Sequence, residues 1–222
     1  IGYEVETVQD ATYNQMRDAL QKFARKALKA EIAIIYFAGH GIEVDRENFL
    51  IPVDAVLETD QEVEFQTISL NMMQRAVSGA SKLKVVLLDA CRNNPFLRQM
   101  RSIRGAASRS TLSGGLAALE PETGTLVGFS AKEGTTASDG EGRNSPYTAA
   151  LLKYITEPNR DVGRMFRKVR DDVLTATGRS QEPFVYGSLP GGDVFLHSVP
   201  TVQQTAPKPA VVATVPQAAK LN

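Results

Sequence analysis

Three short runs of consecutive apolar residues predict the core of the fold. They are IAIIYFA at 32–38, KVVLLDA at 84–90 and TLVGFSA at 125–131. Each run is too short for a long helix and too apolar for a strand with one face in water, which is typical of a parallel strand buried on both faces. Shorter strands are predicted at 3–9 and 193–197. Residues 48–55 indicate a hairpin or an edge excursion, because Pro52 argues against a central strand.

Helical spacing of apolar residues marks four segments. The first begins after a cap at Asp10 or Thr12 and ends near Ala30. Its apolar residues recur every few positions, at Met16, Leu20, Phe23, Ala27 and Leu28. The other helices are predicted at 67–80, 145–155 and 161–177. Strands that alternate with helices predict an α/β fold, a three-layer α/β/α sandwich around a mostly parallel central sheet.

Two segments lack such a pattern. From Arg92 to about Glu120 the chain is rich in arginine, glycine and serine and has no acidic residue before Glu120, which is typical of an exposed, irregular segment. From Pro200 the composition shifts to Pro, Ala, Val, Thr and Gln with almost no charge, which predicts a linker or disordered tail at 200–222. One domain at 1–199 precedes this tail.

Composition and charge narrow the function classes. With 42% hydrophobic residues among 222, the chain can form a globular domain with a buried core. A formal net charge of zero gives no bulk attraction to nucleic acid or to an anionic membrane, and no apolar run approaches the roughly 18 residues of a membrane span. The single cysteine excludes a disulfide within the chain, and with only two histidines it argues against a zinc site.

The first residue, Ile1, is not a start methionine, and IGYEVETVQD reads as a strand already under way. We therefore expect earlier residues to be missing, a signal peptide among them if the protein has one. A reduced thiol favours the cytoplasm, whereas a lost signal peptide would place the protein in the periplasm or outside the cell.

The single cysteine and one histidine each follow a predicted buried strand. Cys91 comes directly after VVLLDA, and His40 lies in GHG after IAIIYFA, 51 residues earlier. Functional residues gather at the carboxyl ends of strands in open parallel sheets, so the two side chains can be neighbours. An imidazole beside a thiol supplies a nucleophilic thiolate. Gly39 and Gly41 permit close approach of a substrate, and the backbone N–H groups of Gly41 and Cys91 could bind an oxyanion.

The motifs YFAGHG and DACRN resemble those of the caspase-like cysteine peptidases (clan CD, peptidase family C14), which include caspases, metacaspases and bacterial orthocaspase-like relatives. The caspase signature has a histidine about 50 residues before the cysteine. The resemblance implies a caspase-like fold, with His40 as general base or acid, Cys91 as nucleophile, and the N–H groups of Gly41 and Cys91 as oxyanion hole. It divides the domain into a large-subunit-like part at 1–97, a linker at 98–120 and a small-subunit-like part at 121–199.

Two departures from the caspase pattern concern substrate specificity. The caspase glutamine two residues before the cysteine is Asp89 here, and residues two apart in a strand face the same way. Counting from Ser130, the arginine with which caspases bind an acidic side chain corresponds to Asp139. Both changes favour a cationic substrate side chain, as in metacaspases, which cleave after Arg or Lys. We expect a basic P1 residue, held by charge-assisted hydrogen bonds to Asp89 and Asp139.

The resemblance raises three further expectations. Family members often cut themselves between their halves, where Arg98, Arg101, Arg104 and Arg109 are candidate autoprocessing sites. Family members also begin with a mid-sheet strand that has no counterpart here, so an upstream segment or another chain would supply it.

No cofactor is expected. Some metacaspases need calcium, and Glu58, Asp60, Glu62 and Glu64 are a candidate site, but their spacing is not that of an EF-hand loop and favours a solvated face.

Other function classes stay open. The domain could be a non-catalytic caspase-like scaffold or regulatory module, although the intact His–Cys pair argues against that reading. A nucleotide-binding flavodoxin-like domain is disfavoured, since no Gly-rich phosphate loop follows the first strand. Taken alone, Cys91 would be a buried structural cysteine, and His197 is interpreted as structural.

Overall fold

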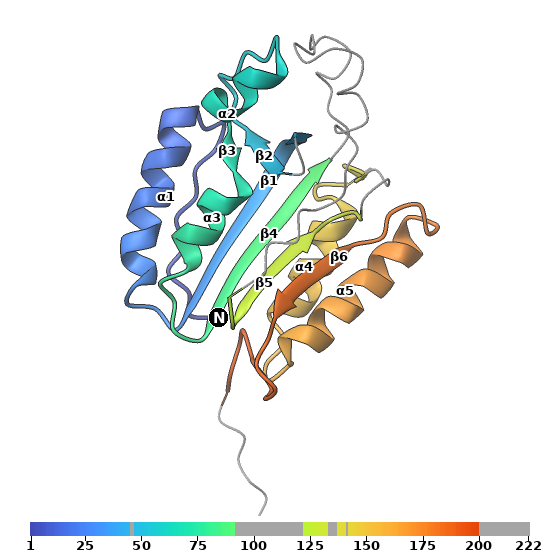
Figure 1. Cartoon of the computed structure of the whole chain (residues 1–222). Helices are drawn as coiled ribbons and strands as arrows, with labels where there is room; N and C mark the ends of the chain where they lie inside the picture. Colours follow the sequence, from blue (N-terminus) through green and yellow to red (C-terminus); the bar gives the residue numbers. More distant parts are fainter. Residues whose placement is uncertain (45–46, 92–121, 133–136, 141, 200–222) are drawn as a thin grey trace, which may run out of the picture.

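A six-stranded β-sheet with helices on both sides forms the body of the protein (Figure 1). The structure, a computed structural model, describes residues 1–44, 47–91, 122–132, 137–140 and 142–199. The strands are β1 (Ile32–Val44), β2 (Glu47–Ile51), β3 (Ile68–Ser69), β4 (Leu83–Cys91), β5 (Thr125–Phe129) and β6 (Phe184–Ser188). The helices are α1 (Tyr13–Ala27), the 3-10 turn η1 (Asp60–Glu62), α2 (Val63–Gln66), α3 (Leu70–Val77), α4 (Pro146–Ile155) and α5 (Val162–Ala176).

The strand order across the sheet is β3-β2-β1-β4-β5-β6. The central strands β1, β4 and β5 are parallel, whereas β2, β3 and β6 join through antiparallel pairs. The predicted α/β sandwich is confirmed, and its sheet is mixed: the pairs β1–β4 and β4–β5 at the centre are parallel, and the other three pairs are antiparallel. The three apolar runs form this centre because they supply apolar side chains to both faces of the sheet.

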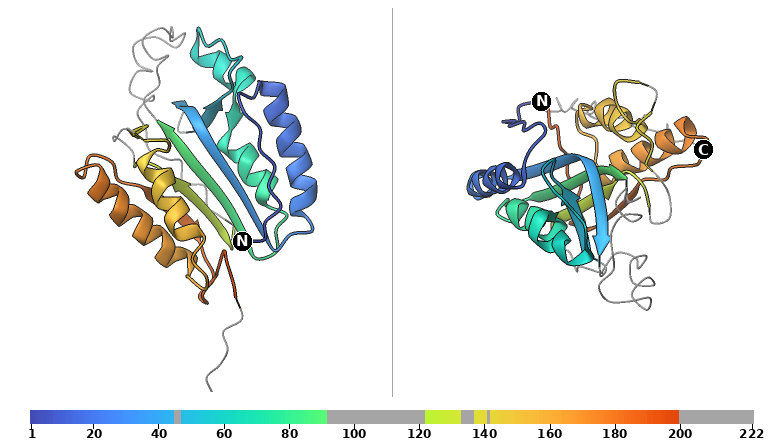
Figure 2. Two further views of the ribbon diagram at one scale, coloured as in Figure 1. Left: turned by 180° about the vertical axis from the view of Figure 1, so that it is seen from behind. Right: turned by 90° about the horizontal axis from the view of Figure 1, so that it is seen from above.

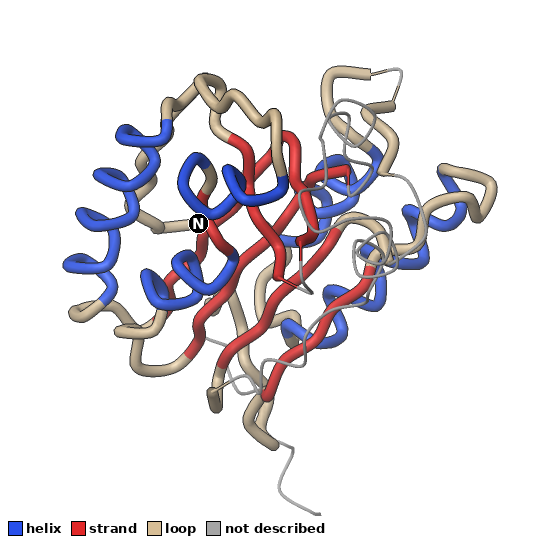
Figure 3. The backbone as a smooth tube through the Cα atoms, turned by 45° about the horizontal axis from the view of Figure 1, so that its top comes forward, coloured by secondary structure: helices blue, strands red, loops and turns tan. Residues whose placement is uncertain are grey.

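Successive side chains of β4 point alternately toward the two layers of helices. Leu83, Val85 and Leu87 pack in a cluster with residues of α4 and α5, whereas Val86 and Leu88 pack in a cluster with residues of α1 and α3. Figures 2 and 3 show one helix pair on each side of the strands. Among the described helices, none is long and apolar enough to cross a membrane.

Two of the predicted strands are wrong. Residues 3–9 form no strand; instead Glu4 and Glu6 form ion pairs with Lys26 of α1, at 2.7 and 3.4 Å. Residues 193–197 make only one bridge, from Phe195 to Asp161. The strand that closes the sheet is β6, which the apolar pattern missed because FVYGS is short and mixed and its Phe184 is exposed.

Candidate active site

The parallel pairing of β1 with β4 places the predicted catalytic pair side by side. The register runs from Ile32 opposite Leu83 to His40 opposite Cys91, so His40 and Cys91 are Cα partners on adjacent strands. Adjacent strands lie about 4.8 Å apart. The His40 side chain is exposed, and the Cys91 side chain lies outside the described part of the structure. Both residues belong to the strands themselves, which are longer than the apolar runs predict.

A hairpin holds the glycine segment that follows His40. The second edge of β1 pairs with β2, from His40 opposite Ile51 to Val44 opposite Glu47. Gly41 is buried there, opposite Leu50. The two predicted oxyanion donors, Gly41 and Cys91, therefore lie on adjacent strands, one register step apart.

Asp89 lies two residues before Cys91 on β4 and is bonded to the start of α4. Its Oδ2 accepts hydrogen bonds from Oγ1 of Thr148 at 2.6 Å and from Oγ of Ser145, the N-cap of α4. The hydroxyl oxygen of Tyr36 on β1 also lies near Oδ2, at 3.3 Å. A helix N-terminus carries partial positive charge, which attracts acceptor groups such as this side chain.

Tyr36 connects β1 to the same cluster. Its hydroxyl lies 2.6 Å from Oγ1 of Thr148. Burial raises the pKa of the Tyr36 hydroxyl, and the nearby Asp89 carboxylate acts in the same direction. Tyr36 therefore keeps its proton at neutral pH and remains able to donate it.

No cation neutralises Asp89 in the described part of the chain. The ion pairs among these residues are formed by other carboxylates, and the partners of Asp89 are three neutral hydroxyl groups. Asp89 is only partly buried. A hydroxyl-bonded carboxylate that lacks a counter-ion is suited to bind a cationic ligand.

Two further hydroxyl groups, those of Ser130 and Tyr147, lie near Asp89. Ser130 continues the β4–β5 pairing, since its N–H donates to Leu88 O at 2.8 Å. Its Oγ and the Tyr147 hydroxyl are buried, and neither has a hydrogen-bond partner among the described residues. Burial raises the pKa of Tyr147 far above its ordinary value. The Tyr147 hydroxyl rests on Gly128, where a Cβ would lie only 2.9 Å from it.

Asp139 is exposed, on a loop after β5. Gln181, which is fully buried, ties this loop down. Its Nε2 donates to Ser130 O at 2.8 Å, and its Oε1 accepts from the Ser138 N–H at 3.0 Å. Among the described residues, the partners of Asp89 are hydroxyl groups near the start of α4 and on β1, whereas Asp139 belongs to the loop that Gln181 holds.

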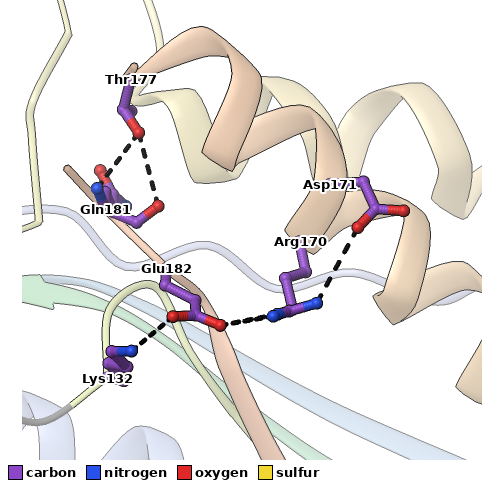
Figure 4. A network of polar contacts seen from close by, with 6 residues as sticks. All are labelled: Lys132, Arg170, Asp171, Thr177, Gln181 and Glu182. Carbon is purple, nitrogen blue, oxygen red and sulfur yellow. Dashed lines mark hydrogen bonds and ion pairs between the residues drawn. The ribbon is translucent and has the colours of Figure 1, made fainter. Parts of the chain in front are cut away.

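Figure 4 shows a second connection at this end of β5. Glu182 accepts from Lys132 at 2.5 Å and from Arg170 of α5 at 2.5 and 3.0 Å. Bonds to these two cations lower the pKa of Glu182 to about 2. The loop after β5 is therefore joined to α5 and to the segment before β6 by both a buried amide and a surface ion-pair network.

Of the acidic residues considered for calcium, Glu62 has local partners, whereas Oδ1 of Asp60 is buried without a hydrogen-bond partner among the described residues. Glu62 accepts from the backbone N–H groups of Glu58 and Thr59 at 2.7 and 2.8 Å, which lowers its pKa. Within the described ranges, no group of three or more His, Cys, Asp or Glu side chains is arranged to hold a metal ion. The arginines at 98, 101, 104 and 109 lie outside the described residues, as does the tail at 200–222.

Comparison with known proteins identifies the class to which this fold and site belong. The caspase domain of peptidase family C14 matches residues 1–193, so the chain belongs to that family. Caspase-1 from Spodoptera frugiperda has a similar fold: the TM-score is 0.59 at 14% sequence identity, over 89% of this chain and 75% of that one.

Two curated relatives are similar over a shorter stretch. The human mucosa-associated lymphoid tissue lymphoma translocation protein 1 is 34% identical over 94 residues, which are 41% of this chain and 11% of that protein. Its mouse homologue is 33% identical over the same extent. The match thus spans about one tenth of the length of these relatives.

The partners of Asp89 and the Gln181 bridge were missed by the sequence analysis. Ser145, Thr148 and Tyr36 are far from Asp89 along the chain, and no motif relates these positions. The one available signal was Ser145 followed by Pro146, which indicates the start of a helix. It does not indicate that this helix start contacts Asp89. Gln181 gave no signal, because a lone glutamine in a loop is ordinarily exposed.

Proposed function

We propose that this protein is a cysteine endopeptidase that cleaves after Arg or Lys. The observation that carries the proposal is the register of β1 and β4, in which His40 and Cys91 are Cα partners and Asp89 precedes Cys91 by two residues. Membership of the peptidase C14 caspase-domain family supports the same chemistry.

The proposed reaction uses an acyl-enzyme. His40 accepts the proton of the Cys91 thiol, and the thiolate attacks the carbonyl carbon of the scissile bond. The N–H groups of Gly41 and Cys91 stabilise the resulting oxyanion. His40 then donates its proton to the leaving amine, the C–N bond breaks, and a water activated by His40 hydrolyses the thioester.

The preference for a basic P1 residue rests on Asp89. A carboxylate bonded by hydroxyl groups and lacking a cationic partner among the described residues would bind an ammonium or guanidinium group and repel an acidic side chain. Asp139, exposed on its loop, would contribute less because water and salt screen it. The same preference would direct self-cleavage to Arg98, Arg101, Arg104 or Arg109.

Cleavage of short fluorogenic peptides tests this function. Peptides with Arg, Lys or Asp at P1 are incubated with the protein, with and without calcium, and Cys91→Ala serves as the control. We expect cleavage after Arg and Lys that is absent in Cys91→Ala. Cleavage after Asp alone would contradict the assignment of Asp89. A folded chain that cleaves none of the peptides would instead favour a non-catalytic scaffold.

We also propose that a further strand completes the sheet, supplied by a segment of the same protein or by another chain. From Ile32 to Gly39, the β1 edge opposite β4 has no strand partner among the described residues, because β2 pairs only from His40 to Val44. An unpaired strand edge is a template for such pairing. Amide hydrogen exchange tests whether this edge of β1 is paired. The N–H groups of Ile32–Gly39 that point away from β4 should exchange rapidly in this chain alone. They should exchange slowly once the further strand is bound. Slow exchange in the isolated chain would contradict the proposal.

A further inference from the structure

The hydrogen bonds to Asp89 are unevenly divided between its two carboxylate oxygens. The contacts of the Ser145, Thr148 and Tyr36 hydroxyls are all with Oδ2, and Ser145 and Thr148 donate the two shorter bonds. Oδ1 accepts none from the described residues, and it is not among the buried polar atoms that lack a partner. A carboxylate oxygen has about two lone-pair positions, so Ser145 and Thr148 fill Oδ2, while Oδ1 is left open by the residues that the structure describes.

The proton positions in this cluster follow from the donor count. A threonine hydroxyl has one proton, and Thr148 gives it to Asp89 at 2.6 Å. The Tyr36 hydroxyl, 2.6 Å from Thr148 Oγ1, must then donate to it. Ser145 donates its proton to Asp89, and its oxygen accepts the Thr148 N–H at 3.0 Å. The Ser145 and Thr148 protons thus point toward Oδ2, while the Tyr36 proton points toward Thr148, and such a chain strengthens its own bonds.

We propose that Ser145, Thr148 and Tyr36 are positioning residues that fix the Asp89 carboxylate and leave Oδ1 as the single acceptor for the substrate cation. The inference rests on the proposed function in one respect, that Asp89 binds the P1 side chain. It adds how that side chain is bound. A guanidinium group needs two free oxygens for its forked, bidentate contact with a carboxylate. With Oδ2 occupied, arginine loses this advantage over lysine.

Two small cations test the pocket without catalysis. The probes are n-butylguanidinium and n-butylammonium, titrated by NMR into the Cys91→Ala protein. We expect the two dissociation constants to lie within about fivefold of each other. Thr148→Val removes one donor and the link to Tyr36, so the carboxylate must be reordered on binding, and both probes should bind about fivefold more weakly. Thr148→Ser keeps the hydroxyl and should restore both affinities.

The matched control is Thr175→Val on α5, which removes a hydroxyl that donates to Asp171 O at 2.9 Å on an exposed helix surface. It should leave both affinities unchanged. Equal weakening by Thr148→Val and Thr175→Val would overturn the inference, because the effect would then be general. Guanidinium binding more than about thirtyfold tighter than ammonium would also overturn it, since that preference requires both oxygens.

Peptide cleavage separates this inference from the proposed function. In the active protein, Arg and Lys peptides should have kcat/KM values within about tenfold, and Thr148→Val should raise KM for both with little change in kcat. If the protein cleaves no peptide but the probes behave as expected, the peptidase fails and the positioning role stands. If peptides are cleaved and Thr148→Val binds both probes as tightly as Thr148→Ser, the peptidase stands and the positioning role fails.

Discussion

Replacing His40 with alanine is expected to lower kcat/KM for an Arg peptide by about 10³-fold. General acid–base catalysis contributes about 10²–10⁴-fold, and in this mechanism one imidazole both deprotonates Cys91 and protonates the leaving amine. The His40 side chain is exposed on β1, opposite Cys91 of β4. Its removal therefore creates no cavity in the core. The measurement is steady-state hydrolysis of an Arg peptide, with circular dichroism to establish that the variant is folded.

The other histidine provides the matched control for this prediction. His197 lies on the surface, its Nδ1 2.8 Å from Thr156 O, where it ties the end of the domain to the end of α4. His197→Ala should retain activity within about twofold. Added imidazole should restore part of the activity of His40→Ala and none of that of Cys91→Ala. A His40→Ala protein as active as His197→Ala would remove His40 from the mechanism.

Asp89→Asn is expected to lower kcat/KM for Arg and Lys peptides by about 10²-fold, mainly through KM. Truncation or neutralisation of one partner in a hydrogen-bonded charge pair costs about 2–5 kcal/mol, and a contact made equally in ground and transition state affects KM more than kcat. Asparagine has nearly the same shape as aspartate, so the loss reports the charge. Kinetics on peptides that differ only at P1 measure it.

Asp139→Asn is the comparison for this second prediction. Asp139 is exposed and has no hydrogen bond to Asp89 among the described residues, so its charge is screened and its loss should cost less than about threefold. A larger effect for Asp139→Asn than for Asp89→Asn would move the specificity role from β4 to the loop after β5.

The apolar runs allowed the central strands to be predicted, because their side chains pack on both faces of the sheet. Burial on both faces is wrong for β1, where Tyr36 and Ala38 are exposed. The apolar runs also placed His40 and Cys91 at neighbouring positions, since parallel strands share the edge at which they end. The exact register did not follow from the sequence, because it depends on how β1 and β4 pair along their whole length. β6 was missed since a short edge strand with one exposed face has little apolar signal.

The cluster around Asp89 could not be predicted for a different reason. A partly buried aspartate on a strand needs a polar partner, but tertiary packing determines which polar group lies beside it. Here α4 is held on β4 by the core cluster to which Leu87, Leu151 and Phe166 all belong. The erroneous strand at 3–9 reflects the same limit: an extended, alternating sequence becomes a strand only when a partner lies beside it.

The Asp89 cluster also joins the two halves of the domain. Asp89 and Tyr36 precede the arginine-rich segment and Ser145 and Thr148 follow it, while β4 and β5 pair along five residues across the same division. Polypeptides ending before and beginning after that segment would each carry only part of this cluster. Two separately expressed pieces would therefore form its hydrogen bonds only when they reassemble, as in fragment complementation.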